Sequence, residues 1–132
     1  MGLPFRGFYS ASKSALDKVT EAIRYEITPF NIQATSIHLG DIQTDIANNR
    51  LNSTVSIEYE TTFKRVFQSM NQHVNQGKNP KEVAIFLDKL IHKKELKPHY
   101  YFGSFGQKSS ILLKKFLPQT WFERIIKKYA NL

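Results

Sequence analysis

Tyr9 and Lys13 are two residues whose types and spacing favour acid–base chemistry. They stand four apart at the start of a helical pattern, so both side chains are expected on one helix face. A free phenol titrates near pH ~10, and a neighbouring ammonium favours the phenolate and lowers that pKa. The pair therefore predicts a general acid or base with an activating lysine. The same spacing also occurs on ordinary solvated helix faces, so the surrounding residues decide between the two interpretations.

Those surrounding residues resemble the active-site signature of the short-chain dehydrogenase/reductase family. Residues 7–16 read Gly-Phe-Tyr-Ser-Ala-Ser-Lys-Ser-Ala-Leu, a Tyr-x-x-x-Lys pattern followed by small residues. In that family the tyrosine exchanges a proton with the substrate oxygen, and the lysine binds the nicotinamide ribose and lowers the pKa of the phenol. The resemblance therefore implies Tyr9 as the general acid or base and Lys13 as its activator, with both residues at the cofactor.

A second match follows a predicted strand at residues 33–39. Residues 39–44 read Leu-Gly-Asp-Ile-Gln-Thr and resemble the family's Pro-Gly-x-Ile/Val-x-Thr, with Leu39 in place of Pro. In the family this loop contacts the nicotinamide end of the cofactor, which implies Gly40, Ile42 and Thr44 as cofactor-binding residues. A glycine also permits close backbone approach beyond the carboxyl end of a parallel strand, where α/β folds bind ligands. Taken by itself, Gly40 is equally a turn that ends the strand.

Hydrophobic periodicity and turn residues predict helix, strand, helix, helix, strand, helix, helix. The predicted helices cover residues 9–28, 59–74, 80–94, 111–117 and 120–129, and the predicted strands cover residues 33–39 and 99–105. Strands separated by helical crossovers favour a parallel α/β sheet. Two parallel strands are too few for a buried sheet. We therefore expect the C-terminal part of a Rossmann-type doubly wound parallel sheet that lacks the N-terminal dinucleotide-binding strands.

The glycines agree with this expectation. In the family, a glycine-rich turn after the first strand places a helix N-terminus at the dinucleotide pyrophosphate. None of the 6 glycines here forms such a cluster, and the family's catalytic Ser and Asn belong upstream of Tyr9 beyond the start of the chain. The resemblance implies NAD or NADP as cofactor and covers the family's C-terminal half. We expect a truncated reading or a fragment.

Residues 1–132 are predicted to form one portion of a single domain, in four segments. These are the catalytic helix and cofactor loop at residues 1–44, the substrate loop and helices at residues 45–78, the last helix and strand at residues 79–110, and a basic amphipathic tail at residues 111–132. The second segment carries an apolar stripe of Tyr59, Phe63, Phe67 and Met70. The stripe either lines a lipophilic substrate pocket or packs on the sheet, and packing is the commoner reason.

The formal net charge of +8 is concentrated near the C-terminus. Residues 1–90 carry 10 basic and 9 acidic side chains, whereas residues 91–132 carry 9 and 2. The tail at 111–132 mixes these cations with apolar groups, so it either makes peripheral contact with an anionic membrane or packs on the substrate pocket or a partner subunit. Its helical phasing offers no platform for stacking bases, so no nucleic-acid partner is expected.

Several classes of chemistry are excluded by composition. The sequence has no cysteine, which removes disulfides, thiolate metal sites and a cysteine nucleophile. The four histidines, His38, His73, His92 and His99, show no paired ligand spacing, so no metal site is predicted. No apolar run reaches the ~18 residues that span a bilayer, and the N-terminus does not read as a signal peptide. We expect a cytosolic protein.

The sequence therefore predicts an NAD(P)-dependent oxidoreductase that interconverts an alcohol and a carbonyl. The resemblance implies a small-molecule alcohol or ketone substrate and a homo-oligomer that pairs through the helix bearing Tyr9. The alternative is a catalytically inactive remnant that acts as a membrane-surface or protein-interaction module through its basic tail.

Overall fold

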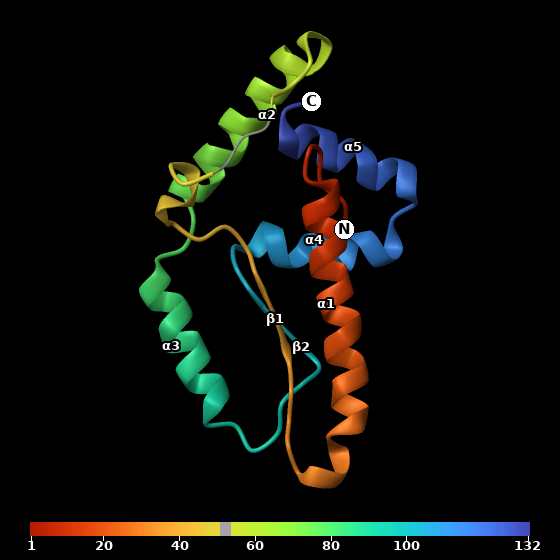
Figure 1. The fold of residues 1–132 in the computed structure, drawn as a ribbon, viewed down its shortest axis with the longest axis vertical. Helices are drawn as coiled ribbons and strands as arrows, with labels where there is room; N and C mark the ends of the chain where they lie inside the picture. The colour runs from red at the N-terminus through yellow and green to blue at the C-terminus, as the bar shows by residue number, and fades with distance from the viewer. Residues whose placement is uncertain (51–53) are drawn as a thin grey trace. The chain divides into compact units, whose positions relative to one another are not determined.

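The computed structural model describes residues 1–50 and 54–132. Residues 51–53, which belong to the predicted substrate segment, lie outside this description. The elements in chain order are α1 (Gly7–Glu26), η1 (Thr28–Phe30), β1 (Ser36–Leu39), η2 (Asp45–Ala47), α2 (Ile57–Asn75), α3 (Pro80–Ile91), β2 (His99–Phe102), α4 (Phe105–Phe116) and α5 (Gln119–Ala130) (Figure 1). They form two compact units, residues 1–39 with 81–102 and residues 40–80 with 103–132.

The first unit has three layers, with the pair β1–β2 between α1 and α3. The strands are parallel, with Ser36 opposite His99 and Leu39 opposite Phe102, so the predicted parallel α/β architecture is confirmed. Side chains along a strand point alternately to the two faces of the sheet. Phe86 of α3 packs on one face, with its ring centroid 5.0 Å from that of Phe102. The other face, which carries His99, is turned toward α1.

Hydrogen bonds outside the strands hold them in this register. The Gln33 amide donates to the carbonyl of Lys94 at 2.7 Å and accepts from the N–H of Leu96 at 2.6 Å. Thr35 donates its hydroxyl to the Lys97 carbonyl at 2.8 Å. These bonds align the residues that precede β1 with those that precede β2, and so support the register in which the two strands pair.

The end of α1 lies two residues before the predicted end at residue 28, ahead of Pro29. The helix ends at Glu26, and Thr28–Phe30 forms a 3₁₀ turn with proline near its start, where a missing N–H costs no helical hydrogen bond. Asn31 follows with φ 54°, a left-handed conformation that asparagine tolerates better than most residues. This turn reverses the chain toward β1.

The helix α1 buries none of its residues in the described structure. Leu16 and Val19 stand three residues apart on one apolar stripe of the helix, and both are exposed over more than half of their surface. The periodic pattern thus predicts the helix correctly. Its apolar stripe lacks cover among the described residues.

The second unit is built from helices. Here α5 packs on α2 and on α4, and the buried side chains are Val66, Met70 and Val74 of α2 with Phe122 and Ala130 of α5. Met70 of the predicted apolar stripe is therefore a core residue. Tyr59 of the same stripe is exposed.

The region after β2 differs from the prediction. The strand ends at Phe102 rather than Phe105, and α4 begins at Phe105 rather than Ile111. Ser104 caps α4, because its hydroxyl accepts from the Gln107 N–H while the Gln107 side chain accepts from the Ser104 N–H. This Ser-x-x-Gln capping box is visible in the sequence and overrides the strand pattern of the aromatic run. The predicted segment boundary between residues 110 and 111 falls inside α4.

Among the described residues, no helix combines the length and the apolar character needed to cross a bilayer.

Candidate functional site

Tyr9 and Lys13 lie in the first two turns of α1, as predicted, and the structure brings their side chains together. The Lys13 Nζ atom lies 5.6 Å from the centroid of the Tyr9 ring, at the distance of a cation–π contact. Tyr9 is 57% exposed, so its phenol is open to a ligand. The pair thus places a phenol and an ammonium one helical turn apart.

The start of α1 adds to the positive charge around the phenol. No side chain caps the helix at Arg6, and its first turn contains no acidic residue. The N–H groups of the first turn therefore present the positive end of the helix dipole without a neutralising carboxylate. The positive end of the dipole and the Lys13 ammonium thus lie at the same end of α1 as Tyr9.

Gly40, Ile42 and Thr44 belong to the second unit, whereas Tyr9 and Lys13 belong to the first. Gly40 directly follows β1, and a Cβ atom there would overlap the Gln107 side chain and lie 3.2 Å from Gly103 Cα. Gly40 therefore packs closely against two other residues of its own unit, and a side chain there would displace Gln107. The glycine is more than a strand-ending turn.

Asp41, which the sequence did not single out, anchors this loop. Its Oδ2 atom accepts a hydrogen bond from Gln107 Nε2 at 2.6 Å and one from the Tyr129 hydroxyl at 3.0 Å. Gln107 belongs to α4 and Tyr129 to α5. One carboxylate thus joins the loop at residues 40–44 to both C-terminal helices, and Gln107 also caps α4.

Backbone pairing with Lys78 holds the other side of the loop. The Gln43 N–H donates to the Lys78 carbonyl at 2.9 Å, and the Lys78 N–H donates to the Asp41 carbonyl at 2.9 Å. A Cβ atom on Gly77 would lie 2.6 Å from the Asp41 carbonyl oxygen, which excludes a side chain at this position. The φ of Gly77 is not positive, so this glycine does not act as a left-handed helix cap. Close backbone approach explains it instead.

Thr44 stands at the end of this held segment. It is exposed, and its side chain does not cap the short helix η2 that follows. Its hydroxyl is therefore presented on a backbone that Asp41 and Lys78 fix in place.

The four histidines separate into distinct environments. The His73 ring stacks on the Tyr129 ring, with 4.4 Å between the ring centroids. The His92 Nδ1 atom lies 3.8 Å from Oδ1 of Asp88, four residues earlier in the chain. His38 and His99, in contrast, contact each other across β1 and β2. Spacing along the chain gave no sign of this pair, because the residues stand 61 positions apart.

Comparisons with known proteins now add to this geometry. A sequence profile of the family described as short chain dehydrogenase matches residues 1–54, which include all five predicted site residues. The chain is 28% identical to the uncharacterized oxidoreductase YusZ of Bacillus subtilis, across 96% of this chain and 47% of that protein. It is also 28% identical to the probable short-chain type dehydrogenase/reductase VdlC of Helicobacter pylori, across 93% of this chain and 46% of that protein.

The chain belongs to the short-chain dehydrogenase/reductase family. A third member, the 3-ketodihydrosphingosine reductase of Bacteroides thetaiotaomicron, is 31% identical across 71% of this chain and 36% of that protein. The chain thus spans about half of these short-chain dehydrogenases, or less.

The residues present fit one end of the nicotinamide cofactor that the family implies. In the first unit, the exposed Tyr9 phenol and the neighbouring Lys13 ammonium are donors that suit ribose hydroxyl groups. In the second unit, the exposed Thr44 hydroxyl is a donor that suits a carboxamide. In the printed sequence, no glycine cluster provides the turn that binds a dinucleotide pyrophosphate. The fit therefore concerns the nicotinamide-ribose end alone.

The close approach at Gly77 is tested by substitution. Gly77→Ala forces the Asp41 backbone to move, and overpacking of this kind lowers the free energy of unfolding by about 1–3 kcal/mol. Gly106→Ala in α4 is the matched control, because a Cβ atom there meets nothing within 4 Å. Urea unfolding followed by circular dichroism compares the two variants. Equal midpoints would contradict the packing role of Gly77.

Proposed function

We propose that this chain supplies the proton-transfer residues of an NAD(P)-dependent oxidoreductase that interconverts an alcohol and a carbonyl. The observation that carries the proposal is the exposed Tyr9 phenol with the Lys13 ammonium 5.6 Å from its ring. Both residues lie within the residues matched by the family profile. The proposal applies to NAD and NADP alike.

In this proposal Tyr9 carries the proton. When bound, the nicotinamide supplies or accepts the electron pair and hydrogen that change the oxidation state of the substrate carbon. The Tyr9 phenolate takes the proton of the substrate hydroxyl during oxidation, and the phenol returns it to the carbonyl oxygen during reduction. Lys13 stabilises the negative charge on the phenolic oxygen and holds a ribose hydroxyl through its N–H groups.

The loop at residues 40–44 is proposed to hold the nicotinamide end of the cofactor. Thr44 contributes its hydroxyl, and Gly40 and Ile42 contribute backbone groups. The contacts of Asp41 with Gln107 and Tyr129 support this role, because they fix the loop before a ligand arrives. A preorganised loop loses less conformational freedom on binding.

We also propose that β1 and β2 are the last strands of a larger doubly wound sheet in the whole protein. Parallel strands are normally buried on both faces, yet Leu39 and Tyr101 are exposed. The apolar face of α1, which no described residue buries, supports the same proposal. We propose that further strands and a second subunit cover this face in the whole protein.

The substrate class in this proposal is a lipophilic alcohol or ketone. The name of one relative, 3-ketodihydrosphingosine reductase, supports a ketone at the reacting carbon of a lipid. Exposed aromatic side chains such as Tyr59 of α2 supply apolar surface for such a molecule.

Substitution of Tyr9 tests the catalytic proposal. Tyr9→Phe removes the proton-exchanging hydroxyl and is expected to lower kcat by at least about 100-fold, with the cofactor Kd nearly unchanged. The assay measures NADPH oxidation by the whole protein in the presence of a panel of lipophilic ketones. Tyr25→Phe is the control, because Tyr25 is an exposed tyrosine of the same helix. Turnover retained by Tyr9→Phe removes Tyr9 from the mechanism.

A second proposed function is contact with an anionic membrane through α4 and α5. The observation that favours it is the exposure of Phe116 and Trp121, which are 79% and 61% exposed, next to Lys114 and Lys115 at the end of α4. Exposed aromatic and basic side chains together suit a lipid headgroup region. This function does not depend on catalytic activity.

The single tryptophan reports membrane contact directly. Vesicles that contain phosphatidylserine are expected to shift the Trp121 emission to shorter wavelength, and phosphatidylcholine vesicles are not, because each lysine near an anionic surface contributes about 1 kcal/mol. The double variant Lys114→Glu/Lys115→Glu is expected to abolish the shift. Lys93→Glu/Lys94→Glu makes the same charge change outside α4 and α5 and should retain it. Equal shifts from both variants would contradict the proposal.

A further inference from the structure

The parallel register of β1 and β2 places two histidines on one face of the sheet. His99 lies opposite Ser36, so His38, two residues further along β1, projects from the same face. The His38 Nε2 and His99 Nδ1 atoms are 3.2 Å apart. Tyr101 stacks on the His38 ring, with 4.8 Å between the ring centroids. This stacking limits the ring orientations available to His38.

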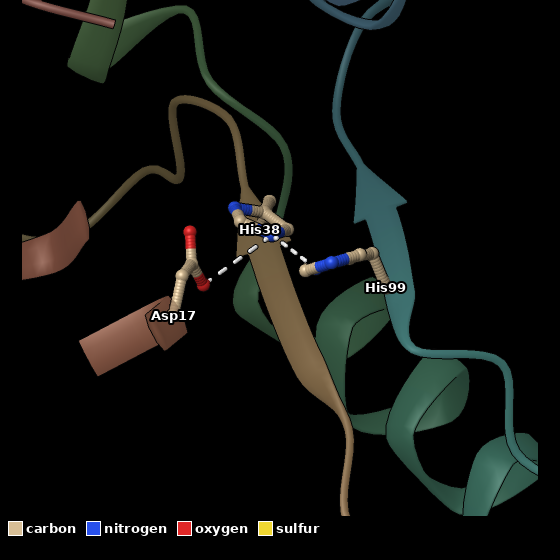
Figure 2. Close-up of side chains that lie close together, drawn as sticks. All are labelled: Asp17, His38 and His99. Atoms are coloured by element: carbon tan, nitrogen blue, oxygen red, sulfur yellow. Dashed lines mark hydrogen bonds and ion pairs between the residues drawn. The ribbon is translucent and has the colours of Figure 1, made fainter. Parts of the chain in front are cut away.

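A carboxylate from α1 completes a cluster of three side chains. The Asp17 Oδ1 atom lies 3.6 Å from His38 Nε2. Figure 2 shows Asp17, His38 and His99 converging from α1, β1 and β2. One potential ligand atom from each residue lies within 4.8 Å of the other two. Three separate elements of the first unit therefore direct ligand groups to a single point.

The separation of these atoms suits a zinc-class ion. Zinc binds imidazole nitrogen and carboxylate oxygen at about 2.0–2.2 Å, so neighbouring ligand atoms of a tetrahedral ion are about 3.3–3.5 Å apart. The 3.2 Å and 3.6 Å distances in the cluster lie on either side of this value. Two imidazoles and one carboxylate are also a ligand set of borderline divalent metals such as zinc, nickel and copper.

We propose that Asp17, His38 and His99 bind one divalent transition-metal ion of the zinc class. The Asp17 and His38 side chains are 35% and 33% exposed, so an ion reaches them without unfolding of the unit. Three protein ligands leave the fourth tetrahedral position to a water molecule. The sequence predicted no metal site, because spacing along one element is the usual signal and here each ligand comes from a different element.

A bound ion would link α1 to both strands. Asp17 lies one turn beyond Lys13 on α1, so the ion would fix the helix that carries Tyr9 and Lys13 relative to the sheet. Binding to the folded state alone raises its stability. The site is separate from the proton-transfer pair, and it stands or falls independently of the proposed oxidoreductase activity.

Histidine resonances of the unmodified chain provide the first test. During titration with zinc chloride, the NMR signals of the His38 and His99 rings are expected to move and to saturate at one equivalent. The signals of His73 and His92 are expected to remain in place, because they lie outside the cluster. If all four rings respond alike, or none does, the proposal is overturned.

Variants supply the second test. Isothermal titration with zinc chloride should show at least about tenfold weaker binding for Asp17→Asn and complete loss for His38→Ala/His99→Ala. His92→Ala is the matched control, because His92 Nδ1 also lies near an aspartate, 3.8 Å from Asp88 Oδ1, but has no second histidine. Circular dichroism confirms that each variant folds. Zinc binding by the double variant that equals the unmodified chain would refute the site.

Discussion

The parallel pairing of β1 with β2 is the interaction on which the other features of the chain depend. It joins segments about 60 residues apart and brings His38 beside His99. Directly after the last pair of residues, Gly40 and Gly103 pack closely under the Gln107 side chain. Because side chains alternate along a strand, a slip of one strand by one residue would place His38 and His99 on opposite faces and remove their contact.

The loop after β1 gives the proposed cofactor site its preorganisation. Asp41 accepts hydrogen bonds from two C-terminal helices, and Gly77 allows the backbone at Lys78 to pair with the loop. Thr44, which is proposed to contact the cofactor, is thus not among the residues that hold the loop. Substitution of Asp41 would act on geometry, whereas substitution of Thr44 would act on ligand contact. The C-terminal helices have a structural role here whether or not they also meet a membrane.

Local patterns in the sequence predicted local features well. The Tyr9–Lys13 spacing placed both side chains on one helix face, and Pro80 marked the first residue of α3, because both signals depend on residues within one or two turns. The start of α4 was missed although Ser104 and Gln107 encode it, because the aromatic run before it has strong strand propensity. The contacts of Asp41 with Gln107 and of His38 with His99 could not be predicted from the sequence, because tertiary contacts have no fixed spacing along the chain.

Lys13 is proposed to hold the nicotinamide ribose beside the Tyr9 phenol, and saturation-transfer difference NMR with NADPH detects this contact directly. The method detects weak binding, which suits a chain whose printed sequence offers no pyrophosphate-binding glycine cluster. This role of Lys13 predicts the strongest transfer to the nicotinamide and its ribose protons, and loss of that transfer in Lys13→Met but not in Lys18→Met. Absence of transfer, or transfer to the adenine alone that Lys13→Met leaves unchanged, would contradict it.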